Sequence, residues 1–208
     1  MKARKILMMG MLVFAATLAG ADEVDDLIKQ GQKAYASGNY RETVDLFQQV
    51  VEKVQARMGA EIGKFFPQPM KGWSAGEIEN SSWSGSSGGE SQSFVNSSRT
   101  YVRAADGMEI SLLFCNWPAI VQGARAGMEV YSNPMMAQML KQQGIEFKSE
   151  EKEGWQVLSI ANAQSDEVQI MAFSDQFMIQ VQTKAGAADT AQAHFAKIDL
   201  AGLGKSLK

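Results

Sequence analysis

The chain has 208 residues, of which 45% are hydrophobic and 21% are charged, and its formal net charge is −3. This composition is typical of a folded globular protein and allows one medium domain or two small ones. The acidic balance argues against nucleic-acid binding, because proteins that bind nucleic acids normally carry a basic stripe. The single cysteine excludes an intrachain disulfide and a zinc site built from several cysteines, and the single histidine excludes a histidine-rich metal site.

The first 21 residues have the features of a secretory signal peptide. Three basic residues near the start precede an uncharged, mostly apolar run over 6–20, and Ala19-Gly20-Ala21 fits the small-residue pattern before a cleavage site. The alternative is a membrane anchor, but a run of about 15 residues is short for a span of roughly 20. We therefore expect a periplasmic or secreted protein that begins at Asp22, with no membrane span after cleavage. Loss of the three basic residues leaves the mature chain with a charge of −6.

Residues 22–66 are predicted to form a helical hairpin. Apolar residues recur at helical spacing over 24–35 and again over 44–62, and Ser37-Gly38-Asn39 interrupts the pattern between them. The second helix is expected to end at Pro67. Its last apolar residues (Val54, Met58 and Ile62) need another apolar surface, which we expect to be the following domain or a second subunit.

This hairpin resembles one tetratricopeptide repeat over about residues 24–57. Gly31 matches the small residue of the family's first helix, Gly38-Asn39-Tyr40 matches its turn, and Phe47 matches the large residue of its second helix. Two positions depart from the family pattern, because Thr43 and Val50 stand where the family usually has small residues. The resemblance implies a helical hairpin that binds a protein or a peptide.

A single repeat cannot bury its own apolar face, so this hairpin must dock on its own domain, on a copy of itself or on a partner. The candidate partner-binding residues are Tyr35, Tyr40 and Phe47, which we expect near the inner surface of the hairpin. A homodimer is left open.

Residues 67–208 are predicted to form an α+β domain, an antiparallel sheet of about six or seven strands with helices packed on it. Asp106-Gly107 lies between two apolar runs and predicts a β-hairpin, whereas the Ser- and Gly-rich stretch 81–93 predicts a mobile loop. Asn133-Pro134 is typical of the start of a helix. Four strands are expected over 145–150, 155–161, 167–173 and 177–184, and a closing helix over 188–199.

This arrangement resembles small exported modules of the PsbP/Mog1-like group. The segment Gly72-Trp73-Ser74-Ala75 is also similar to the start of uncharacterised bacterial exported proteins of α+β type. Neither resemblance carries catalytic residues that can be transferred to this chain.

The sequence contains no recognisable catalytic constellation. Gly-rich phosphate loops, a Gly-x-Ser-x-Gly elbow and a His-Glu-x-x-His motif are all missing from it. Cys115 and His194 are the only thiol and imidazole, and no spacing rule brings them together, so we interpret both as structural. We therefore assign no catalytic, cofactor-binding or metal-binding residue and expect a protein that is not an enzyme.

Four methionines lie close together in the sequence, namely Met128, Met135, Met136 and Met139. Thioethers suit Cu(I), but methionines at helical spacing usually fill hydrophobic cores. We predict that the last three share the inner face of one helix with Leu140.

The favoured hypothesis is an exported, non-enzymatic envelope protein that binds another protein or a peptide. The alternative is a small-ligand or copper-binding module of the periplasm, which would use the methionines or the cleft between sheet and helices.

Overall fold

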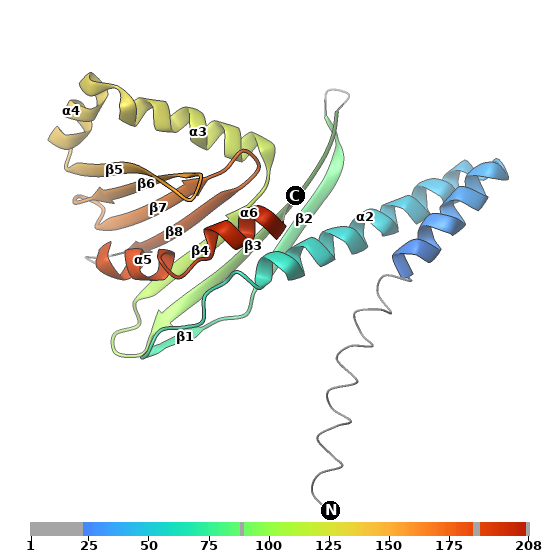
Figure 1. The fold of residues 1–208 in the computed structure, drawn as a ribbon, viewed down its shortest axis with the longest axis horizontal. Coiled ribbons are helices and arrows are strands. Elements are labelled where there is room, and N and C mark those ends of the chain that lie inside the picture. Colours follow the sequence, from blue (N-terminus) through green and yellow to red (C-terminus); the bar gives the residue numbers. More distant parts are fainter. Residues whose placement is uncertain (1–22, 88–89, 185–187, 207–208) are drawn as a thin grey trace, which may run out of the picture. The chain divides into compact units, whose positions relative to one another are not determined.

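The computed structural model describes residues 23–87, 90–184 and 188–206 (Figure 1). The signal peptide expected over 1–21 and the cleavage site before Asp22 lie outside the described residues. The chain forms two compact units, which divide between Arg57 and Met58, inside helix α2 (Tyr40–Gly63).

The first unit, called the hairpin unit below, pairs a helix over residues 23–36 with the first part of α2. Gly38 adopts a φ of +77°, which side chains with a Cβ avoid, and the Asn39 amide donates to the Ala34 carbonyl at 2.9 Å. This turn is the reason that the first helix stops at the Ser-Gly-Asn triplet. The predicted interruption of the helical pattern is confirmed.

The second unit, called the sheet unit, contains an eight-stranded antiparallel sheet in the order β1-β3-β4-β8-β7-β6-β5, with β2 paired to β3. The α+β class is confirmed, with eight strands where about six or seven were expected. The strands are β1 (Trp73–Ala75), β2 (Glu79–Ser87), β3 (Glu90–Arg103), β4 (Glu109–Cys115), β5 (Ile145–Lys152), β6 (Trp155–Asn162), β7 (Glu167–Phe173) and β8 (Met178–Lys184).

Helices cover both faces of this sheet (Figure 1). Helices α5 (Ala188–Phe195) and α6 (Leu200–Ser206) cover one face, and together with the end of α2 they enclose the main core. Helix α3 (Pro118–Ser132) packs on the other face over a smaller cluster, and α4 (Pro134–Gln142) follows it. The main core includes Ile62, Tyr101, Ile110, Leu112, Phe114, Ile170, Ile179, Val181 and Phe195.

Two predicted local signals are confirmed. The Asp106-Gly107 pair closes the turn between β3 and β4, with Gly107 at a φ of +72°. Asn133 caps α4 by accepting hydrogen bonds from the amides of Met135 and Met136, at 3.0 and 3.4 Å.

The prediction of a mobile loop over 81–93 was wrong for the residues that the structure describes, 81–87 and 90–93, whereas 88–89 lie outside them. Strand β2 pairs with β3 residue for residue from Glu79 opposite Ser98 to Ser87 opposite Glu90. Trp83 stacks on Phe94, with ring centroids 5.8 Å apart. Serine and glycine are poor strand formers in isolation, and here the cross-strand ladder and the aromatic pair outweigh their intrinsic preference.

The closing helix expected over 188–199 ends earlier, at Phe195 (α5), and a separate helix (α6) follows it. Asp199 stands between α5 and α6, and its Oδ1 accepts a hydrogen bond from the Gly202 amide at 2.8 Å. An aspartate that satisfies a free amide in the first turn is a helix start signal, and it begins α6 here.

Candidate functional site

The candidate site is the apolar surface of the hairpin unit. Among the described residues, nine large hydrophobic side chains are exposed, and five of them lie between Tyr35 and Val54. These five are Tyr35, Tyr40, Val44, Phe47 and Val54. This set is called the hairpin stripe below. A short helical segment therefore carries more than half of the exposed large apolar side chains of the described chain.

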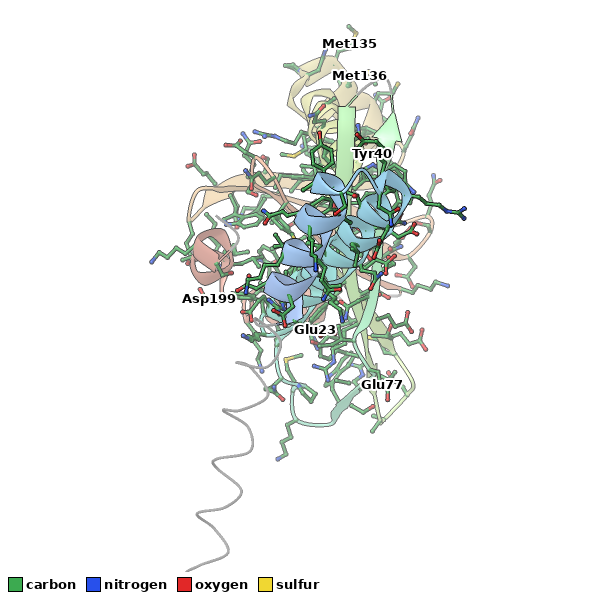
Figure 2. All side chains as sticks on the ribbon, turned by 90° about the vertical axis from the view of Figure 1, so that its right-hand side faces the viewer. Glu23, Tyr40, Glu77, Met135, Met136 and Asp199 are labelled. Carbon is green, nitrogen blue, oxygen red and sulfur yellow. The ribbon has the colours of Figure 1, made fainter. Side chains whose placement is uncertain are left out.

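Two of the three predicted binding residues lie on the outside of the hairpin. Tyr35 and Tyr40 are 64% and 65% exposed, and their rings meet edge to face at 5.8 Å. Figure 2 labels Tyr40 at the start of α2. The prediction that both lie near the inner surface was wrong, because they flank the interhelical turn, where the two helices enclose little volume.

Phe47 has a different environment. A Cβ built on Gly31 would stand 3.0 Å from the Phe47 ring, so the phenyl group packs directly on the backbone of the first helix. Gly31 and Phe47 therefore form a contact between the two helices. Part of the same ring remains exposed.

A local hydrogen bond accounts for the threonine at position 43 of the hairpin. Thr43 is buried, and its hydroxyl donates to the Asn39 carbonyl at 2.8 Å. A buried hydroxyl without a partner would be costly, and this bond to the preceding turn satisfies it. This bond explains how the hairpin accommodates threonine at this buried position.

The sequence analysis counted Val44 among the apolar residues of the second helix but did not name it as a binding residue, and it is 62% exposed. On α2, Tyr40, Val44, Phe47, Val51 and Val54 follow one another at steps of four and three residues. This spacing places them on one helical stripe and was the signal that could have found Val44.

The last turns of α2 have apolar partners in the sheet unit. Ile62 is fully buried in the main core and Met58 packs against it. Phe66, which follows the helix, meets Phe114 edge to face at 4.7 Å. Val54, which lies before the division between the units, is exposed.

Cys115 and His194 lie in different clusters. Cys115 is buried on the α3 face of the sheet with Phe173 and Met178, and its burial raises the pKa of the thiol. His194 packs on the opposite face against Tyr101, with ring centroids 5.2 Å apart. The structure does not bring the thiol and the imidazole together.

The histidine is an unusual element of the main core. It is 1% exposed, its Nδ1 donates to the Thr190 carbonyl at 3.0 Å, and its ring meets Trp73 at 4.9 Å. No described group forms a hydrogen bond with its buried Nε2. Burial lowers the pKa of His194, because a charged imidazolium would lose its hydration.

The prediction that the methionine group fills a core was wrong for two of its members. Met135 is 76% exposed and Met139 is also exposed, and α4 has no buried residue. Figure 2 labels Met135 and Met136 on this helix. Met128, in contrast, packs against the cluster under α3. Asn133-Pro134 predicted where α4 begins, but helical spacing did not show that no described element covers the side of the helix that carries Met135 and Met139.

The sheet unit has an open groove of about 710 Å³ at the ends of β5, β6 and β7. Its lining combines Lys141, Glu146, Asn162 and Asp166 with the ring of Phe147. The mixed charges and the open shape give this groove no distinct ligand preference.

Within the described part of the chain, no three His, Cys, Asp or Glu side chains are grouped so that they could hold a metal ion. No helix in that part is long and apolar enough to cross a membrane. No protein-family model, curated protein or solved structure matches the chain.

Proposed function

We propose that this chain is an exported, non-enzymatic envelope protein that binds another protein or a peptide through the hairpin stripe. The observation that carries the proposal is the exposure of Tyr35, Tyr40 and Val44, which are each more than 60% accessible to solvent. Contiguous apolar surface on a soluble unit marks an interaction site, and tyrosine is enriched at such sites.

The chemistry of the remaining chain supports a binding role. The only thiol and the only imidazole are buried in separate clusters, and burial shifts the pKa of each group towards its neutral form. A nucleophilic thiolate needs the opposite shift and a nearby base. The resemblance of the hairpin to a tetratricopeptide repeat supports a protein or peptide as the ligand.

A site-specific cross-linking experiment tests the binding surface. A photo-reactive amino acid replaces Tyr40 or Val44 in the producing cell, and the matched control carries it at Gln49, another exposed position of α2. We expect a discrete adduct from positions 40 and 44 but not from 49. Val44→Asp should abolish the adduct formed from position 40, whereas Gln49→Asp should not.

The proposal fails if positions 40 and 44 give no adduct, or if position 49 gives the same one. Export has its own test, because the purified protein should begin at Asp22 and occur in the periplasmic or culture fraction. An intact Met1 in the membrane pellet would contradict export while leaving the binding surface to be judged by cross-linking.

Copper binding is the second candidate, and the exposure of α4 favours it. Met135 and Met139 stand one helical turn apart with their thioethers accessible, where Cu(I) could reach them. A Cu(I) titration of the protein and of the Met135→Ala, Met139→Ala variant decides this point. Loss of tight binding in the variant, with an unchanged free energy of unfolding, would support copper binding, and equal binding by both proteins would exclude this site.

A further inference from the structure

The two edges of the sheet differ in how they are protected from other strands. The outer edge of β5 has five charged residues among its eight, which is a common device against unwanted pairing. From Glu79 to Gly85, β2 has only one charged side chain, no proline and no bulge in its register. Among the described strands, β2 pairs only with β3.

The hydrogen bonds of Val95 show which groups β2 presents outward. The Val95 amide donates to Asn116 Oδ1 at 2.6 Å, and the Asn116 amide donates to the Val95 carbonyl at 3.4 Å, so the backbone of Val95 points away from β2. Ser82 lies opposite Val95 in the antiparallel register. In such a ladder, the backbone groups of Ser82 must then point away from β3, and by alternation so do those of Asn80 and Ser84.

Trp83 is at the centre of this edge. It is 44% exposed although it stacks on Phe94, which in turn stacks on Trp117 with ring centroids 4.5 Å apart and planes 10° apart. Trp83 also lies over Gly85, where a Cβ would stand 2.5 Å from the indole. Glycine at this position makes room for the large ring on the surface of an edge strand.

We propose that two copies of this chain pair through their β2 strands, antiparallel and with Trp83 opposite Trp83 of the second copy. In this register Ser82 of each copy lies opposite Ser84 of the other, and both residues present their backbone groups to the shared edge. Trp83 then forms a pair with Trp83 of the second copy that has no backbone hydrogen bonds between the two copies. In pairs of this kind opposite side chains are closest. Each copy contains a stack of three rings, Trp83, Phe94 and Trp117. In the dimer the two stacks form one continuous row of aromatic rings across the twofold axis.

The charge pattern also favours a second copy as the occupant. Glu79 of each copy lies opposite position 87 of the other, so the two carboxylates are about 27 Å apart at a rise of roughly 3.4 Å per residue. No like charges meet between Glu79 and Gly85. Two-fold pairing of one patch with itself is the commonest way in which soluble proteins form dimers.

The first test measures the mass of the purified protein by sedimentation or light scattering. We expect a dimer, and we expect Ser82→Pro to give a folded monomer, because it removes an outward amide that β3 does not use. The matched control is Ser149→Pro on β5. The hydrogen bond from the Ala163 amide to the Gly144 carbonyl (3.0 Å) places Gly144 opposite Ala163 in a bonded pair, so the backbone of Ser149 also points outward by alternation. This variant should remain dimeric.

The second test uses disulfide cross-linking to determine the register. Trp83→Cys should form an intermolecular disulfide on mild oxidation, because opposite Cβ atoms in a pair without hydrogen bonds lie about 4.5–5.5 Å apart. Ser81→Cys should not, because its two copies would be about 14 Å apart along the strands. The native thiol of Cys115 is buried, so we expect it to form no intermolecular disulfide in this experiment.

The proposal is overturned if the protein is monomeric at every concentration measured, or if Ser82→Pro leaves a dimer intact. Cross-linking from position 81 in place of position 83 would overturn the register. A monomer whose β2 strand pairs with an extended peptide would overturn the proposal of a dimer. The inference does not rest on the hairpin stripe, so loss of cross-linking at Tyr40 and loss of the dimer are separate outcomes.

Discussion

The hairpin unit and the main core of the sheet unit differ in how far their aromatic side chains are buried. In the sheet unit Tyr101, Phe114 and Phe195 are almost completely buried, whereas in the hairpin unit Tyr35 and Tyr40 are largely exposed. The sheet encloses a core between its strands and the helices on each face, but two helices alone have no third layer under which large rings could be covered. The buried rings of the sheet unit therefore contribute more to stability than the exposed rings of the hairpin unit.

The largest expected effect comes from a change in the main core. Phe114→Ala removes a fully buried ring that meets Phe66 edge to face, and it should lower the free energy of unfolding by about 3–5 kcal/mol. Tyr40→Ala, at an exposed position, should change it by no more than about 0.5 kcal/mol. Urea unfolding followed by tryptophan fluorescence measures both, and equal effects would contradict the comparison between the units.

The end of α2 should behave as part of the sheet unit. Ile62→Ala creates a cavity in the main core and should cost about 2–5 kcal/mol, although the residue belongs to the same helix as Tyr40. Val54→Ala, at an exposed site two turns earlier, is the matched control and should cost much less. If the two variants unfold alike, the last turns of α2 do not depend on the main core.

Acid should weaken the sheet unit through His194. The folded state lowers the pKa of this group below 6.5, so the unfolded chain binds the proton more readily. The corresponding stability is complete above pH 6.5 and is lost as the pH falls below that value. Lys197 adds to the shift, because its positive charge opposes a second one on the ring.

The measurement is the free energy of unfolding between pH 7.5 and pH 5. Because the chain has one histidine, His194→Gln should flatten this pH dependence even if it lowers stability at every pH. An unchanged slope in the variant would show that another group is responsible.

The smallest effect is expected at the exposed turn between β3 and β4. Arg103 forms two hydrogen bonds with Asp106, at 2.8 and 2.6 Å, and they lower the pKa of the carboxyl group to about 2 from 3.8. The carboxylate therefore favours folding above pH 4, and its contribution disappears as the pH falls towards 2. Asp106→Asn should reduce the loss of stability over this range, and acid titrations of both proteins provide the comparison.

Much of the candidate site could be predicted from local signals. Ser37-Gly38-Asn39 predicted the interhelical turn that the structure contains, whereas the contact between Gly31 and Phe47 became visible only in the structure. The exposure of Tyr35 and Tyr40 could not be predicted in the same way, because helical spacing shows which residues share a face but not what covers that face. The loop predicted over 81–93 failed for a related reason, since strand formation there depends on cross-strand partners.

Turns and helix starts could be read from the amino-acid sequence, because their positions depend on the backbone preferences of a few neighbouring residues. Gly107 at a positive φ and Asn133 as a helix cap are examples. The burial of apolar residues could not be read in this way, since it depends on elements that are far apart in the chain and meet only in the folded protein. Met135 and Ile62 are both apolar residues on helices of the sheet unit, yet Met135 is exposed and Ile62 is buried, because only Ile62 lies among the residues of the main core.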